Sequence, residues 1–247
     1  MEVADLERPP AGVTVLRHRG GAAAKVAVEW SDAAPVLIGQ ALRVPSVTAL
    51  RITAPEGGED DHLYWEDDRD EDGEPTPATT VETGALATLD LGGLAELDLS
   101  YLRIGALGAK TLAVSAYLRA EAADLGTVPG GHRLETLDLR YCGIGNTGLA
   151  ALAASPLFSG VRRLRLQNNV ITEKGAPALH RFTGLTDLDL RYNEIGVEGV
   201  RALLAAPFVP SLTRLLLYRS DVGDEGAALL AQAPQLPPAL RSFWRSA

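Results

Sequence analysis

The sequence predicts an α/β solenoid, in which short parallel strands form one face and helices form the other. The first observation is a recurring pattern, L-x-x-L-x-L followed five residues later by Ile or Val. Its copies begin at Leu94, Leu134, Val161, Leu185 and Leu212. The second is their spacing, because the last four copies start 27, 24 and 27 residues apart, as stacked repeats do. The third is composition, since 46% of the 247 residues are hydrophobic, enough for a continuous core.

Each repeat unit has a simple physical logic. In L-x-L the apolar side chains alternate, so a strand buries its leucines on one side and presents the intervening residues on the other. A short polar residue at the ninth position can bond the bending backbone of neighbouring coils. That position holds, in chain order, Leu102, Cys142, Asn169, Asn193 and Ser220, so only a partial ladder is expected. One repeat cannot bury its apolar face alone, whereas stacked repeats can.

The full form, L-x-x-L-x-L-x-x-N-x-I-x-x-x-G-x-x-x-L, resembles the ribonuclease-inhibitor-like subclass of leucine-rich repeats over Leu94 to Ala233. The resemblance implies a right-handed horseshoe with parallel strands on the concave face and helices on the convex face. The family includes ribonuclease inhibitors and activators of small GTPases. The resemblance therefore implies recognition of a protein partner and, as an alternative, regulation of an enzyme such as a small GTPase.

Residues 1–53 are predicted to form an N-terminal cap and a degenerate first repeat. Apolar stretches at 13–17 and 25–30 flank Gly20-Gly21, which suggests two antiparallel strands. A solenoid needs such a cap because its first coil would otherwise expose core. The range 47–53 has the repeat spacing and is predicted to be the first repeat strand.

A helix is expected between the cap and this first strand. Ser31 or Asp32 is the predicted N-cap, and the helix should run to about Leu42. Pro35 is compatible with it because proline is tolerated in the first helical turn.

Residues 54–85 are predicted to be an acidic loop insertion. The range 56–74 holds eleven acids and one base, a local charge of −10, so the rest of the chain is nearly neutral. Asp68–Gly73 matches the opening of a calcium loop, but its twelfth position is Thr79 where a bidentate Glu is required, which favours a solvated loop. The apolar residues 63–65 within this stretch are expected either to pack against the solenoid or to contact a partner.

Residues 86–247 are predicted to hold the repeats and a C-terminal cap. Leu86–Leu91 imitates a repeat strand, but it begins too close to Leu94 to leave room for a return helix. The strand is therefore placed at Leu94–Leu99. Helices are expected at about 106–124, 147–154, 173–181, 197–205 and 225–232, and a final capping strand at 240–244.

Several function classes find no support in the sequence. The net charge of −9 offers no basic surface for nucleic acid, and no apolar run approaches a membrane span. The acidic N-terminal residues lack signal-peptide features and Cys142 is the single cysteine, so the expected compartment is the cytoplasm. The four histidines lie in separate segments, and Cys142 occupies the repeat's Asn position. We therefore predict a non-enzymatic protein without metal or cofactor.

The concave face is the predicted binding surface for a protein partner, because tyrosine and arginine are enriched at interface hot spots. The predicted contact residues are Arg140, Tyr141, Arg165, Arg191, Tyr192, Tyr218 and Arg219. A competing interpretation is a self-satisfied charge ladder Asp138–Arg165–Asp189, in which each exposed pair contributes ~0–1 kcal/mol. A third is a structural subunit that docks through the acidic loop.

Overall fold

The structure is a computed structural model that describes residues 10–55, 83–89, 91, 93–123 and 134–246. Its strands form a single sheet in which each strand lies beside the next one along the chain. β1 pairs with β2 antiparallel, and all later neighbours are parallel. The strands are β1 Val13–Arg19, β2 Ala22–Glu29, β3 Ala49–Thr53, β4 Glu96–Asp98, β5 Thr136–Asp138, β6 Arg163–Arg165, β7 Asp187–Asp189 and β8 Arg214–Leu216. This sequential order confirms the predicted solenoid.

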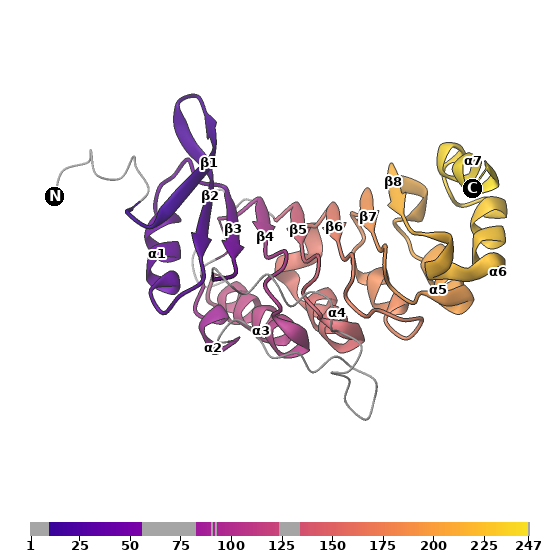
Figure 1. The fold of residues 1–247 in the computed structure, drawn as a ribbon, viewed down its shortest axis with the longest axis horizontal. Helices are drawn as coiled ribbons and strands as arrows, with labels where there is room; N and C mark the ends of the chain where they lie inside the picture. The colour runs from indigo at the N-terminus through magenta and orange to yellow at the C-terminus, as the bar shows by residue number, and fades with distance from the viewer. Residues whose placement is uncertain (1–9, 56–82, 90, 92, 124–133, 247) are drawn as a thin grey trace.

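The helices lie on the side opposite the strands. Figure 1 shows β3 to β8 in a row along one edge of the molecule, with α2 to α5 along the other. The α-helices are α1 Ala34–Ala41, α2 Thr83–Leu86, α3 Gly105–Ala123, α4 Gly145–Ala154, α5 Gly196–Leu204, α6 Arg219–Gln232 and α7 Pro238–Ser246. Short 3-10 helices, η2 Pro156–Gly160, η3 Ala176–Arg181 and η4 Val209–Ser211, complete the returns. None of the described helices is long and apolar enough to cross a membrane.

The leucines of the strands stack as one buried ladder. In register, Leu137 is paired with Leu164, Leu164 with Leu188, and Leu188 with Leu215. All four are at most 3% exposed and belong to one continuous core. Leu97 continues the ladder toward β3, which confirms the strand at Leu94–Leu99 over the imitation at Leu86–Leu91. The core is therefore a single column that every repeat shares.

Asparagines form a second buried ladder where the strands turn. The amide of Asn193 donates to the Leu166 and Leu190 carbonyls, at 2.8 and 2.9 Å. Its Oδ1 accepts from the backbone nitrogens of Asn169 and Ile171, at 3.1 and 3.0 Å. One side chain thus satisfies buried backbone groups of two repeats, which would otherwise be costly to bury.

Cys142 occupies the equivalent place one repeat earlier. Its thiol donates to the Leu99 carbonyl at 3.0 Å and is fully buried. Burial raises the pKa of Cys142 far above its ordinary value. The thiol is therefore a structural group, as its place in the repeat predicts.

The structure corrects four local predictions. Helix α1 begins after Ala33, so neither predicted residue caps it. The helix expected at 173–181 is instead the shorter 3-10 helix η3, Ala176–Arg181. Pro177 lies in its first turn, where proline is tolerated. Helix α6 begins six residues before the predicted start and is kinked at Gly223, whose φ is 70°. Helix α4 begins at Gly145, two residues before the predicted start, and the side chain of Asn146 bonds Thr172 of the next repeat, at 2.9 and 3.0 Å.

The predicted capping strand at 240–244 is wrong, because this segment is helix α7. Leu240 and Trp244 are four residues apart and therefore share one helical face. That face packs against α6, where Trp244 is 5% exposed. A helix buries this pair together, whereas an added strand would leave α6 uncovered at the end of the solenoid.

At the other end, the predicted antiparallel cap is confirmed as the β1–β2 hairpin. Gly20 and Gly21 both have positive φ, 60° and 85°, which a two-residue hairpin turn requires. The first repeat strand is confirmed as β3, and it pairs directly with β4 across the predicted insertion. The acidic segment 56–74, with Trp65 and the calcium-like loop, lies outside the described residues. The division into 1–53, 54–85 and 86–247 stays a prediction.

Candidate functional site

The candidate site is the outward side of the strands, which we call the strand face. Strand register aligns its residues in columns, one running Glu96, Thr136, Arg163, Asp187, Arg214 and the next Asp98, Asp138, Arg165, Asp189, Leu216. These are the columns that the repeat spacing predicts. Among the described residues, three aspartates of the second column are nonetheless buried: Asp98, Asp138 and Asp189.

These aspartates are buried because each one caps the turn that follows its strand. In all three repeats, Oδ1 accepts a hydrogen bond from the backbone nitrogen two residues later. The distances are 3.1 Å for Ser100, 3.3 Å for Arg140 and 3.2 Å for Arg191. The side chain of that same residue also donates to the carboxylate, at 2.7, 2.8 and 2.9 Å respectively. The repeated D-L-[SR]-Y motif is therefore first of all a turn motif.

The tyrosine that ends this motif has an unusual backbone conformation. Tyr101, Tyr141 and Tyr192 have φ of 68°, 57° and 57°, in the left-handed region. For an L-residue this region costs roughly 1–2 kcal/mol, and Asn or Gly adopts it more readily. Asn168 holds the corresponding place in the intervening repeat, with φ of 52°. Tyrosine is therefore a costly choice at a position where Asn is sufficient for the fold.

The structure brings three of the predicted residues together beside β8. The rings of Tyr192 and Tyr218 meet edge to face, with their centroids 4.9 Å apart. The guanidinium of Arg191 lies 5.9 Å from the Tyr218 ring centroid. Tyr192 is 54% exposed and Tyr218 39%. We call these three residues the tyrosine cluster.

Local bonds fix the groups of the tyrosine cluster. Arg191 binds both oxygens of Asp189, at 2.9 and 2.6 Å, and this bond raises the pKa of Arg191. Hydrogen bonding with Tyr218 raises the pKa of Tyr192 above its ordinary value. The backbone nitrogen of Tyr218 donates to Asp221 at 2.6 Å. The cluster thus presents a preordered aromatic and cationic surface to solvent.

The other predicted residues of the strand face lie nearer the middle of the sheet. Tyr141 stacks on Tyr101 with centroids 4.7 Å apart, and its hydroxyl accepts from Gln167 at 3.2 Å. Arg140 and Arg165 share the carboxylate of Asp138, at 2.8 and 3.0 Å. Sequence reasoning left Tyr101 out of the contact set, although the recurrence of D-L-[SR]-Y pointed to it.

The predicted charge ladder Asp138–Arg165–Asp189 forms only in its first half. Arg165 bonds Asp138 on the neighbouring strand, at 3.0 Å. Asp189 is held by Arg191, from the turn that follows its own strand, at 2.6 Å. Pairing within the turn motif takes precedence because the two partners are only two residues apart.

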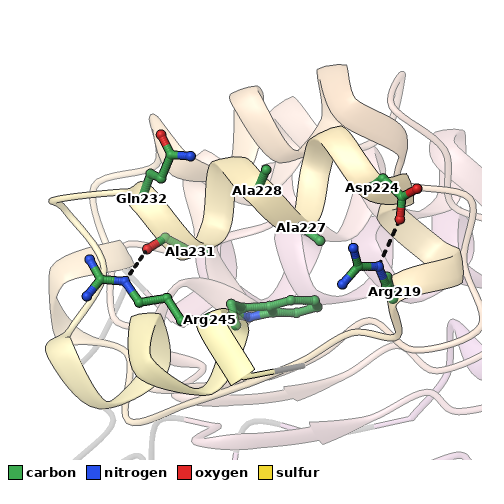
Figure 2. Close-up of a pocket in the computed structure, with 8 residues that line it drawn as sticks. Arg219, Asp224, Ala227, Ala228, Ala231, Gln232 and Arg245 are labelled. Atoms are coloured by element: carbon green, nitrogen blue, oxygen red, sulfur yellow. Dashed lines mark hydrogen bonds and ion pairs between the residues drawn. The ribbon is translucent and has the colours of Figure 1, made fainter.

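Arg219 does not join the tyrosine cluster. It is the first residue of α6 and bonds Asp224 at 2.8 Å. Figure 2 shows it at one end of a pocket between α6 and α7, with Arg245 at the other end. Trp244 also lines this pocket. Arg245 donates to the Ala231 carbonyl at 3.1 Å, so local partners engage both arginines. The repeat spacing puts Arg219 in a strand-face column only if the last repeat turns like the others.

The last repeat turns differently because its polar residue is shifted by one position. Ser220, at the ninth position, is exposed, whereas Asp221 is 7% exposed and accepts from the Tyr218 nitrogen. Burial raises the pKa of Asp221 above its ordinary value. The bond to Asp221 starts α6 immediately after Tyr218, which removes Arg219 from the column.

The described residues contain no group of three or more His, Cys, Asp or Glu side chains that could hold a metal ion. His180 contacts the Ala202 carbonyl at 2.7 Å, a packing role between η3 and α5. The strand face itself offers aromatic rings, guanidinium groups and bonded carboxylates. Chemically, this arrangement is suited to binding.

Comparison with known proteins agrees with the repeat structure. The family model described as Leucine Rich repeat matches residues 132–153 and 184–204. The first matched range contains β5 and most of α4, and the second contains β7 and the whole of α5. A search of curated proteins found no match. The two matched repeats are therefore leucine-rich repeats, and the observed fold is that of a leucine-rich-repeat solenoid.

Proposed function

We propose that this chain is a non-enzymatic interaction module of the ribonuclease-inhibitor-like subclass, which binds a protein partner through the strand face. Leucine-rich repeats generally mediate protein–protein interaction. The spacing of 24 to 27 residues between the last four repeats and the helical returns favour the subclass. Within the strand face, the tyrosine cluster is the proposed anchor of the partner.

The observation that carries this proposal is the backbone strain at Tyr192. Strained residues persist where the surrounding structure fixes them, and they concentrate at functional sites. Tyr192 has positive φ, yet more than half of its side chain is exposed, so burial in the core does not explain the tyrosine. Aromatic and arginine side chains anchor interfaces because they bury much area at a low cost in conformational entropy.

The proposal is tested with paired variants and a partner purified by affinity capture on the whole chain. Changing Tyr192→Ala together with Tyr218→Ala should weaken binding of that partner by at least about tenfold, or ~1.4 kcal/mol. A sharper variant is Tyr192→Asn, because Asn168 shows that asparagine suits this turn. It should keep or raise the thermal midpoint while it weakens binding.

The matched controls lie on the helix side of the molecule. Glu173→Ala and Arg201→Ala remove exposed charged side chains and should leave binding unchanged. A structural subunit that docks through the acidic segment predicts the reverse, with Trp65 sensitive and the tyrosines silent. Regulation of an enzyme would appear as a changed turnover of the captured partner. Tyrosine variants that bind as wild type would contradict the proposal.

A further inference from the structure

We infer that the partner presents a carboxylate-rich protein surface to the arginines of β6 and β8. This inference rests on the proposed function and deepens it by naming the chemistry of the partner. The residues that carry it are Arg163, Arg165 and Arg214, none of which belongs to the tyrosine cluster. They lie beside it on the same sheet, as the strand register requires.

The charge of this half of the strand face differs from that of the whole chain. On β5 to β8, the outward positions one before, one after and three after the middle leucine of each strand hold five arginines, Arg140, Arg163, Arg165, Arg191 and Arg214. The same positions hold three aspartates, Asp138, Asp187 and Asp189. The local formal charge is therefore +2, on a chain whose net charge is −9. A positive surface on an acidic protein favours association with a negative one.

The two kinds of charge also lie at different depths. The side chains of Arg163 and Arg214 are 51% and 55% exposed. The carboxylates of Asp138 and Asp189 are only 3% and 5% exposed, because they cap the turns beneath. A partner that approaches this face therefore meets the guanidinium groups of Arg163 and Arg214 before it meets these two carboxylates.

These guanidinium groups retain donors for a partner. Arg163 uses its Nε to bond Thr136 at 2.8 Å, while its Nη2 is 3.8 Å from Glu135. Arg214 is 3.6 Å from Asp187, which is longer than a hydrogen bond. A guanidinium carries five N–H donors, and a carboxylate can accept two of them side by side. The exposed arginines can therefore each bind an incoming carboxylate.

A carboxylate-bearing protein fits this face better than a nucleic acid does. Glu135 and Asp187 lie among the arginines, and Glu135 is 51% exposed. A continuous phosphate backbone would pass close to these negative groups, whereas a protein surface can place its acids selectively over the arginines. The exposed aromatic pair beside them suits an apolar side chain on the same partner.

The test measures direct binding of a simple acidic probe to the full chain. The probe is a fluorescent peptide of about ten glutamates, followed by anisotropy at roughly 50 mM salt, where screening is weak. The comparison probes are an equally long lysine peptide and a single-stranded oligothymidine of equal charge. The key variant is Arg163→Gln with Arg214→Gln, which we call the strand-face variant. It removes two exposed positive charges, and because glutamine is neutral it adds no negative charge beside Asp187.

The control variant removes the same charge from the helix side, Arg181→Gln with Arg201→Gln, both exposed. We expect the glutamate peptide to bind, to lose roughly tenfold in affinity in the strand-face variant, and to be unaffected in the control. Raising the salt to roughly 300 mM should weaken binding to wild type more than to the strand-face variant. Circular dichroism should report the same fold for all three proteins.

Three results would overturn the inference. Equal affinity of the glutamate peptide for wild type and the strand-face variant would show that the arginines do not bind carboxylates. Tighter binding of the oligothymidine, lost in the same variant, would identify a nucleic-acid surface. Salt-dependent self-association that the variant abolishes would identify a second copy of this chain as the occupant, in place of a separate partner.

The two proposals fail in different ways. If the tyrosine variants lose the captured partner but the arginine variant keeps it, the interaction surface stands and its preference for acids is wrong. If both sets of variants keep the partner while the helix-side controls lose it, the proposed function itself is wrong.

Discussion

The interior of the solenoid and its strand face follow opposite rules. Inside, the same residue type returns in each repeat, as in the stack Leu137, Leu164, Leu188, Leu215. On the strand face, the column one position earlier reads Thr136, Arg163, Asp187, Arg214. Stacked repeats share one core, so an interior position must match its neighbours above and below. An outward position is under no such demand, which leaves it available for recognition.

The largest expected effect comes from breaking the interior. Leu164→Ala should lower the free energy of unfolding by about 2–5 kcal/mol, because it leaves a cavity between two stacked leucines. The same substitution on the strand face, Leu216→Ala, removes a half-buried side chain and should cost under about 1 kcal/mol. Urea denaturation of both variants measures the contrast. Equal losses would mean that the assigned repeat register is wrong.

The second largest loss of unfolding free energy should come from removing a buried polar side chain of the interior. Asn193→Ala removes the acceptor of two buried N–H groups and a donor to three carbonyls, and should cost about 2–3 kcal/mol. Its control is Gln167→Ala on the strand face, whose amide bonds only the Tyr141 hydroxyl among its described contacts. That change should cost under about 0.5 kcal/mol. Similar losses for the two variants, measured by thermal unfolding, would argue against a structural role for the asparagine ladder.

The same contrast explains what the sequence could predict. Interior positions were assigned correctly because a repeated leucine pattern has only one way to stack, and the register of β4 to β8 follows from it. For the strand face, the sequence alone predicts solvated charges. Asp138 and Asp189 are buried instead, since each bonds the backbone two residues later. That bond is local, so the recurrence of D-L-[SR]-Y was a readable signal.

The ends of the chain show a second limit of sequence reasoning. A repeat pattern says where the array stops but not how its last coil is covered. Leu240 and Trp244 are one helical turn apart, a spacing that favours a helix over the predicted strand, and α7 packs against α6. Arg219 departs from its predicted place on the strand face for a related reason. Asp221, and not Ser220, accepts the hydrogen bond from the Tyr218 nitrogen, so α6 begins at Arg219.

The smallest expected effect on stability comes from relieving backbone strain at one position, Val170, in the turn after β6. Val170 follows Asn169 with φ of 56°, a conformation that a β-branched residue rarely adopts. The equivalent residue one repeat earlier is Gly143, with φ of 61°. Val170→Gly should therefore raise the free energy of unfolding by about 0.5–1 kcal/mol, since relief of strain exceeds the entropy that glycine adds to the unfolded chain.

Urea midpoints of Val170→Gly and of the converse change, Gly143→Ala, measure this effect with opposite expected signs. Both Val170→Gly and Tyr192→Asn replace a strained residue in the turns that follow the strands. Only the second removes an exposed ring of the tyrosine cluster, so only the second should weaken partner binding. If Val170→Gly weakens partner binding as strongly as Tyr192→Asn does, then turn rigidity, and not the tyrosine side chain, governs recognition on this face.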